Sequence, residues 1–162
     1  MNIVTLGDER LKKHSILVPE FDGEIQTLTE QMFETMYANK GIGLAAVQVG
    51  KLIRLFITHI PNDAARVFIN PELVETSLEQ GAFEEGCLSI PEVNADVLRP
   101  QQLKVQAWNL KGRPFSMDAD DLLARVIQHE LDHLNGVLFI DRLDPKKRER
   151  LVKRYEKVIS DG

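Results

Sequence analysis

The sequence predicts an α+β fold in which short, mostly antiparallel β-sheets pack around a central helix that carries an HExxH motif, followed by a C-terminal helix. Two observations predict it. Apolar residues recur at three- and four-residue spacing in three segments, which is the period of a helix, and they alternate in several stretches between them, which is the period of a strand. These strands do not follow the helices in the regular order of a parallel βαβ series.

Size and composition limit the class of protein. The chain has 162 residues, 43% of them hydrophobic and 28% charged, which suits one ordinary folded domain over residues 1–162. We find no apolar run near the ~20 residues that a membrane span needs. Acidic and basic residues occur near the start of the sequence, before any apolar stretch long enough to be a signal peptide. A single cysteine, Cys87, suits a reducing compartment, so we expect a cytoplasmic protein that does not enter a membrane.

The first half of the chain predicts one helix and two strands. The helix runs from Asp22, a good N-cap, to Asn39, and Gly41 ends it. Its apolar face comprises Ile25, Leu28, Met32 and Met36. Residues 51–60 alternate as a strand, and residues 65–73 form a second strand that Pro71 closes.

The second half predicts a hairpin arm, the central helix, a short strand and a last helix. Residues 102–114 alternate up to a turn at Lys111-Gly112. The central helix begins near Asp118 or Asp120 and ends at Asn135-Gly136. Residues 137–143 are expected to be a short strand. The final segment is an amphipathic helix with an apolar face of Leu151, Val152, Tyr155, Val158 and Ile159.

The central helix carries a histidine pair that suggests a metal site. His129 and His133 are four residues apart, so both imidazoles lie on one helix face, and Glu130 lies beside them. They continue an apolar stripe with Leu122 and Val126, so they point toward the core. Two buried imidazoles without a metal are hard to satisfy. The alternative is a helix that carries two histidines for structural reasons.

A metal site needs a third protein ligand, and Cys87 is the best candidate. No His or Cys follows Gly136, whereas Cys87 lies upstream in "EEGCLSIP". The alternative for a lone cysteine is a small buried apolar residue. A further stretch, "GIGLAAVQVG", has Gly41 and Gly43, which permit a close backbone approach, and one polar side chain, Gln48. The alternative interpretation of this stretch is a buried turn in which the Gln48 side chain bonds to the backbone.

These three stretches, in this order, resemble the signatures of the peptide deformylase family. They are Gly41-Ile42-Gly43-Leu44-Ala45-Ala46-Val47-Gln48, Glu85-Gly86-Cys87-Leu88-Ser89 and His129-Glu130-Leu131-Asp132-His133. The likeness extends over nearly the whole chain. It implies one catalytic domain that removes the formyl group from the N-terminal formyl-methionine of newly made proteins and releases formate.

The resemblance also implies residue roles. Cys87, His129 and His133 would hold one divalent metal ion, usually Fe²⁺, which Zn²⁺ or Ni²⁺ can replace. Glu130 would move the proton from water to the departing amine. The Gln48 amide and the Leu88 backbone N–H would stabilise the negative charge on the formyl oxygen.

Substrate contacts are implied in the same way, with two departures from the family pattern. Backbone groups of Ile42 and Gly43 would bind the peptide as an added strand. The methionine pocket would be lined by Phe83, Leu122, Val126 and His129, whose apolar members could equally be core residues. Asn94 stands where many relatives have a substrate-binding arginine, and Arg125 stands where they often have an aliphatic residue. We expect Arg125 to lie at the pocket edge and favour acidic or short following residues.

The C-terminal segment, residues 145–162, is basic. Residues 145–158 hold seven Lys and Arg and two Glu, which gives this segment a charge of +5. Because the net charge of the whole chain is −5, the rest of the chain carries −10. Family members can dock at the ribosomal exit tunnel through such a helix, which implies ribosome binding but no sequence-specific nucleic-acid contact. The alternative is a solvated helix face with internal ion pairs.

Three other functions remain open from the residues. A metalloprotease that cuts internal peptide bonds shares the histidine pair and Glu130, although no downstream ligand is present. A cytoplasmic binding module with a decayed site is a second alternative, against which the intact polar residues argue. Because of Asn94 and Arg125, a relative that hydrolyses a different N-acyl amide is the third.

Overall fold

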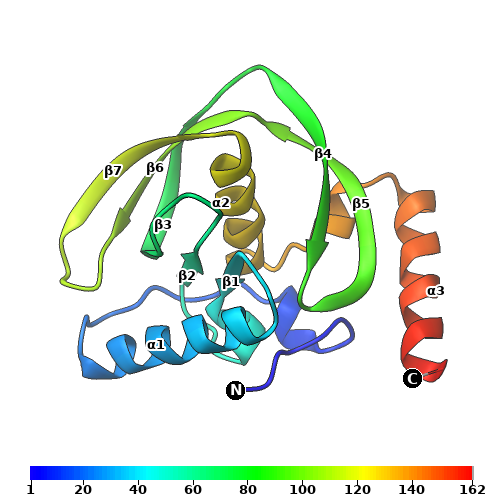
Figure 1. The fold of residues 1–162 in the computed structure, drawn as a ribbon, viewed down its shortest axis with the longest axis horizontal. Helices are drawn as coiled ribbons and strands as arrows, with labels where there is room; N and C mark the ends of the chain where they lie inside the picture. The colour runs from blue at the N-terminus through cyan, green and yellow to red at the C-terminus, as the bar shows by residue number, and fades with distance from the viewer. Residues whose placement is uncertain (162) are drawn as a thin grey trace.

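The computed structural model describes residues 1–161, and its architecture is the predicted α+β fold (Figure 1). The helices are α1 (Gly23–Ala38), α2 (Asp121–Leu134) and α3 (Pro145–Asp161). The strands are β1 (Gly43–Ala45), β2 (Leu55–Thr58), β3 (Arg66–Thr76), β4 (Gln80–Cys87), β5 (Ile90–Pro100), β6 (Gln102–Trp108) and β7 (Pro114–Asp120). Short 3₁₀ turns are η1 (Glu9–Lys12), η2 (Ala46–Val49) and η3 (Phe139–Arg142).

All strand pairs within the two sheets are antiparallel, as the sequence predicts. One sheet has the order β1-β2-β3-β6-β7, and β4 and β5 form a separate two-stranded hairpin. Helix α2 lies between them: it packs against the five-stranded sheet and faces the hairpin on its other side (Figure 1). The central helix is therefore in contact with both sheets.

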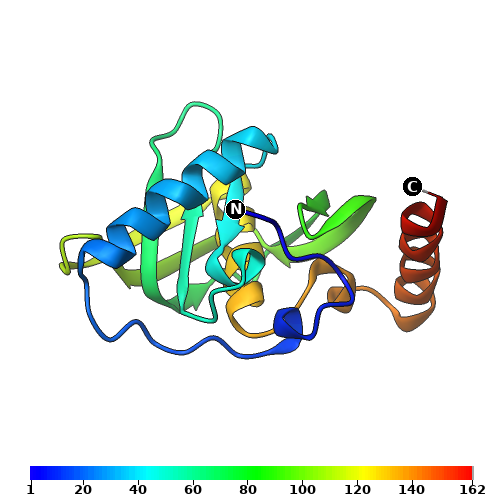
Figure 2. The same ribbon diagram turned by 90° about the horizontal axis from the view of Figure 1, so that it is seen from below.

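Around β2, apolar residues cover both faces of the five-stranded sheet. Phe56 and Phe68 point toward α2 and stack on each other, whereas their neighbours Leu55 and Ile57 pack under α1. Figure 2 shows α1 lying across that second face. Both faces of β2 are therefore buried, whereas β6 and β7 expose alternate residues.

A third apolar cluster joins the hairpin to the C-terminal part of the chain. It contains Val93, Ala95 and Val97 from β5, Phe139 and Ile140 from η3, and Tyr155 from α3. Tyr155 is the buried residue of α3, and the rest of that helix is half-buried or exposed. None of the helices described is both long and apolar enough to cross a bilayer.

Several predicted elements are confirmed. Asp22 caps α1 by accepting hydrogen bonds from the N–H groups of Glu24 and Ile25. Gly112 adopts a left-handed conformation in the turn between β6 and β7. Helix α2 starts after Asp120, and Gly136 is left-handed just beyond its end. Helix α1 ends slightly earlier than predicted, because Lys40 rather than Gly41 takes the left-handed position.

The strand predicted for residues 137–143 is wrong, because this segment contains the 3₁₀ turn η3. Leu138, Phe139 and Ile140 are all buried, so the segment does not alternate between a core face and a solvent face. The Asp141 carboxylate accepts a hydrogen bond from the Leu138 N–H at 2.8 Å, and this local bond favours a turn over an extended strand.

The prediction that Pro71 closes its strand is also wrong, since β3 continues to Thr76. The pairing of β3 with β6 shifts register between Ile69 and Glu72, and Asn70 has a positive φ of 49°. A β-bulge of this kind accommodates a proline that cannot donate a hydrogen bond to the neighbouring strand. The Asn70 side chain fixes the bulge by bonding both backbone groups of Val18.

Strand β1 approaches helix α2 very closely at Gly43. A Cβ atom at this position would lie 2.5 Å from Oε2 of Glu130 and 2.8 Å from a methyl carbon of Val126. The expected close backbone approach at Gly43 is therefore present, and its partner is the helix that carries the histidines.

We predict that Gly43→Ala lowers the free energy of unfolding by about 1–3 kcal/mol, because the added methyl group is forced against two buried side chains. Denaturant unfolding monitored by circular dichroism measures the change. Gly23→Ala is the matched control, since a Cβ there meets nothing within 4 Å. Equal stability of the two variants would contradict this account of the contact between β1 and α2.

Candidate metal centre

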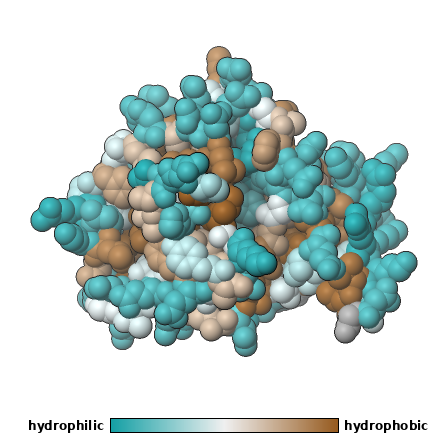
Figure 3. Space-filling view, viewed as in Figure 1, coloured by the Kyte–Doolittle hydropathy of each residue, from teal (hydrophilic) through white to brown (hydrophobic). Residues whose placement is uncertain are grey.

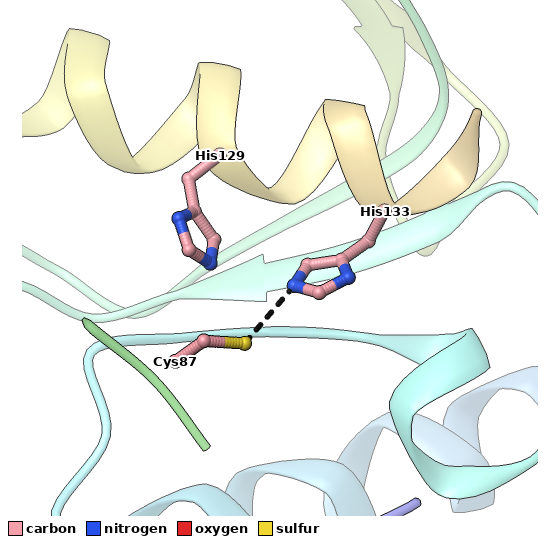
Figure 4. A group of neighbouring side chains, drawn as sticks. All are labelled: Cys87, His129 and His133. Carbon is pink, nitrogen blue, oxygen red and sulfur yellow. Dashed lines mark hydrogen bonds between the residues drawn. The ribbon is translucent and has the colours of Figure 1, made fainter. Parts of the chain in front are cut away.

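Cys87, His129 and His133 converge from two elements that are remote in sequence. Cys87 ends strand β4, and the histidines lie one turn apart on α2 (Figure 4). One potential ligand atom from each residue lies within 4.8 Å of the other two. Sγ of Cys87 is 3.3 Å from Nε2 of His133. We call these residues the Cys–His–His group.

A register shift at the end of the hairpin sets the place of Cys87. Gly86 pairs with Asn94, whereas the next residue, Cys87, pairs with Ile90. Such an irregularity turns a side chain away from the direction that regular pairing would give it. A Cβ atom at Gly86 would meet the end of the exposed Asn94 side chain.

A buried carboxylate orients His129. Oε1 of Glu85 is 2.9 Å from Nδ1 of His129, so the Nε2 atom of that ring is left for the Cys–His–His group. Arg99 donates two hydrogen bonds to the same carboxylate, at 2.7 and 3.0 Å. Burial opposes the charge on Glu85, but the hydrogen bonds with His129 and Arg99 outweigh it and lower the pKa of the carboxyl to about 2.

The same arginine links the hairpin to the far end of α2. Arg99 also donates to Asp132 at 3.0 Å, and Arg142 forms two further bonds with that carboxylate. Glu85, Arg99 and Asp132 are all less than 10% exposed. Because buried charges are costly unless they are paired, this network fixes β4, β5 and α2 in one relative position.

The electrostatics of the two histidines suit a bound cation. Burial and the neighbouring His129 hold the pKa of His133 well below its usual value, which leaves its ring neutral and able to bind a metal. Burial alone would lower the pKa of His129, but hydrogen bonds with Cys87 and Glu85 raise it well above its usual value. The surroundings of His129 therefore favour positive charge at this place.

The donor set also fits a metal ion chemically. One sulfur and two imidazole nitrogens form a set that suits Fe²⁺, Zn²⁺ and Ni²⁺. A purely structural role does not explain why both imidazoles face the Cys87 thiol, whereas coordination of one shared ion does.

Glu130 and Gln48 lie beside this group. Glu130 is 4% exposed, and its Oε1 atom has no hydrogen-bond partner among the described residues. Burial raises the pKa of Glu130 to about 7, so the carboxyl can exchange a proton near neutral pH. Gln48 accepts a hydrogen bond from the Ala45 N–H, and its Nε2 atom is 3.1 Å from Oγ of Ser89 and 3.5 Å from Sγ of Cys87.

A cleft of about 520 Å³ opens onto these residues. Figure 3 shows apolar surface in a hollow near the middle of this face, framed by hydrophilic residues. The cleft brings together most of the residues that the sequence suggested: Ile42, Gly43, Gln48, Cys87, Leu88, Leu122, Arg125, Val126, His129 and Glu130. Asn94 is not among its lining residues.

Phe83 lies outside this cleft. The residue is 59% exposed and lines a neighbouring hollow instead. Arg125 lines both hollows, and its guanidinium is bound to Glu85 and to the backbone carbonyls of Gly81 and Val97. Arg125 therefore lies where the cleft meets the neighbouring hollow, and its guanidinium is ion-paired with Glu85.

Sequence reasoning missed the ion-paired network. Glu85 and Asp132 lie inside two of the recognised motifs, close to Cys87 and His133. Arg99 could have been found from its position, because it continues the buried alternation of Val93, Ala95 and Val97. A charged residue on the core face of a strand indicates a buried partner.

Comparison with known proteins agrees with this geometry. The family model described as polypeptide deformylase matches residues 1–149. A peptide deformylase from Brucella suis is 43% identical over 162 residues, covering 98% of this chain and 93% of the relative. One from Acinetobacter baumannii is 46% identical, covering 97% and 90%.

Solved structures show the same likeness. The peptide deformylase of Ehrlichia chaffeensis in complex with actinonin superposes with a TM-score of 0.94 at 39% identity, covering 97% of this chain and 96% of that one. The Legionella pneumophila peptide deformylase gives 0.93 at 41% identity, covering 98% and 95%. The chain belongs to the polypeptide deformylase family and is a metal-dependent hydrolase that removes the N-formyl group from the formyl-methionine of newly made peptides, releasing formate.

Proposed function

We propose that Cys87, His129 and His133 hold one divalent ion, which is Fe²⁺ in the cell and which Zn²⁺ or Ni²⁺ can replace. The observation that carries this proposal is the approach of one thiol and two imidazoles to within 4.8 Å. When bound, the ion would supply a Lewis acid and activate water near neutral pH. The ligand types exclude a site built for Mg²⁺ or Ca²⁺, which prefer oxygen.

In this proposal Glu130 moves the proton. Its unpartnered Oε1 atom is buried beside the Cys–His–His group, and Glu130 also lines the cleft. The carboxylate takes a proton from the attacking water and delivers it to the amine nitrogen as the formyl C–N bond breaks. The close packing of Gly43 against Oε2 limits the movement of this side chain.

Gln48 and Leu88 are proposed to stabilise the formyl oxygen. The Gln48 side chain is positioned by the Ala45 N–H, so its Nε2 group is held near Cys87. Negative charge develops on the formyl oxygen during attack, and a fixed donor at that place is worth roughly 3 kcal/mol. The Leu88 N–H is the second donor, since Leu88 follows Cys87 and lines the cleft.

The peptide is proposed to lie along β1. This strand is at the edge of the five-stranded sheet, and Ile42 and Gly43 line the cleft, so an extended peptide can add there as a further strand. Leu122 and Val126 supply apolar surface for the first side chain, next to His129. Phe83, in the neighbouring hollow, is then at the outer limit of that pocket.

Residues 1–162 act in this proposal as one catalytic domain that works in the cytoplasm on chains leaving the ribosome. Helix α3 would contact the ribosome. It extends from the edge of the molecule (Figures 1 and 2) and exposes Arg150, Arg154 and Lys157 at helical spacing. A cationic helix face suits the polyanionic surface of ribosomal RNA.

Anaerobic purification followed by metal analysis tests the metal proposal. We expect one iron per chain and release of formate from formyl-Met-Ala-Ser, because the site offers three strong ligands. Chelation should abolish formate release, and added Fe²⁺, Zn²⁺ or Ni²⁺ should restore it. A preparation without metal that still releases formate at the original rate would refute the proposal.

Glu130→Gln should retain the metal and lose about 10²–10⁴-fold in kcat, because an amide cannot accept the proton. Metal content and formate release, measured on one preparation, separate the two effects. Glu34→Gln, on the exposed face of α1, is the control and should keep full activity. Loss of the metal from Glu130→Gln would count against the role of Glu130.

Reversing the charge of α3 should weaken ribosome binding. We expect the triple variant Arg150→Glu, Arg154→Glu and Lys157→Glu to bind at least about tenfold more weakly in cosedimentation at low salt, with a smaller salt dependence. Lys12→Glu, Lys13→Glu and Lys51→Glu change the net charge equally at exposed positions outside α3 and form the control. Equal loss in both triple variants would show a general charge effect, not docking by α3.

A further inference from the structure

Arg125 joins the helix that carries two of the proposed metal ligands to the hairpin that carries the third. Its backbone is in α2, one turn before His129, and its guanidinium reaches the hairpin of β4 and β5. There it donates a hydrogen bond to Oε2 of Glu85 at 2.5 Å. Glu85 lies two residues before Cys87. Arg125 therefore links the two elements of the Cys–His–His group through one buried carboxylate.

The hairpin backbone holds the guanidinium of Arg125 as well. Arg125 donates to the carbonyl oxygen of Val97 on β5 at 2.9 Å and to that of Gly81 on β4 at 2.8 Å. The Arg125 side chain is 11% exposed and the Glu85 side chain is 4% exposed. Because these polar groups have little access to water, each depends on its partners in the protein, and a shift of one disturbs the others.

The carboxylate of Glu85 takes part in a full set of hydrogen bonds. Oε1 is 2.9 Å from Nδ1 of His129 and accepts a bond from Arg99 at 3.0 Å, whereas Oε2 accepts bonds from Arg99 and Arg125. An ionised carboxylate has about four acceptor positions, and these four bonds occupy them. A rotation of the carboxylate therefore breaks bonds on both oxygens, including the one that orients His129.

Arg99 and Arg125 connect the hairpin to α2 at different places. Arg99 is on β5, in the same hairpin as Glu85, and its second carboxylate partner is Asp132, which follows His129 by three residues on α2. Arg125 precedes His129 by four residues on that helix. The two arginines thus hold the hairpin to α2 on either side of His129. Without Arg125, this connection would remain on one side only.

We propose that Arg125 is a positioning residue, which holds Glu85 against His129 and thereby slows the release of the bound metal ion. The inference rests on the proposed metal site and adds to it a residue that is not itself a ligand. Replacement of the hydrogen-bond partner of a ligating histidine typically changes metal affinity by about 10–100-fold. Arg125 acts through that partner, so we expect an effect at the lower end of this range.

Release of Zn²⁺ to an excess of a colorimetric chelator tests this inference without turnover. For zinc-loaded Arg125→Leu we expect the release rate to rise at least about tenfold over wild type, because the carboxylate no longer fixes the His129 ring. Arg125→Lys keeps a positive charge beside Glu85 but lacks the planar fork that reaches both carbonyls, so its rate should lie between the two. In cobalt-loaded Arg125→Leu the visible absorption bands should shift, since they report the arrangement of the ligands.

Arg54→Leu is the matched control. Arg54 also bonds to backbone carbonyls, those of Ser15 and Leu134, and it fastens the other end of α2. Its replacement loosens that helix next to His133 and leaves Glu85 untouched, so zinc release and the cobalt spectrum should stay at their wild-type values. An unchanged release rate in Arg125→Leu, or an equal rise in Arg54→Leu, overturns the inference.

A second variant covers a failure of the first to fold. If Arg125→Leu is insoluble, the release rate of Arg125→Gln decides by the same criterion, because glutamine removes the charge and keeps a polar end. A wild-type protein that takes up neither zinc nor cobalt would refute the proposed metal site itself. Loaded variants that release zinc at the wild-type rate overturn the role of Arg125 alone.

Discussion

The buried carboxylate of Glu85 is the interaction on which the site depends. It lies on β4 two residues before Cys87, and it binds His129 and Arg125 from α2 and Arg99 from β5. The two elements that supply the sulfur and the nitrogens are therefore joined by one group of charged hydrogen bonds. Such a group is stabilising only when every member is paired, and removal of one partner of a buried ion pair typically costs about 3–5 kcal/mol.

This constraint explains why the cleft and the metal centre occur together. The hairpin stands apart from the five-stranded sheet, so the space between it and α2 is closed by side chains and not by strand pairing. Arg99 and Asp132 close one part of that space, Arg125 closes another, and the remaining opening is the cleft. Gly43 lets β1 approach from the other side, so the peptide edge, Glu130 and the Cys–His–His group share one small volume.

Much of this arrangement could be predicted from the sequence, and the failures have physical causes. Helical spacing identified α1 and α2, and recognised motifs identified the residues that line the cleft. The interpretation of residues 137–143 as a strand failed because three consecutive apolar residues fit a buried turn equally well. The predicted end of β3 was wrong because Asn70 supports a β-bulge, which lets the strand continue past Pro71. Its hydrogen-bond partner Val18 is remote in the sequence, so the pattern around Pro71 does not predict the bulge. The hydrogen-bond partners of Arg125 could not be predicted, because the sequence does not show which strands face α2.

The most direct test of the central claim is X-ray absorption at the metal edge of the loaded protein, compared between wild type and Cys87→Ser. The account predicts one sulfur and two imidazole nitrogens among the nearest neighbours of the metal in wild type, and loss of the sulfur alone in the variant. A wild-type spectrum without a sulfur neighbour, or without imidazole, would contradict the joining of β4 and α2 around a single ion.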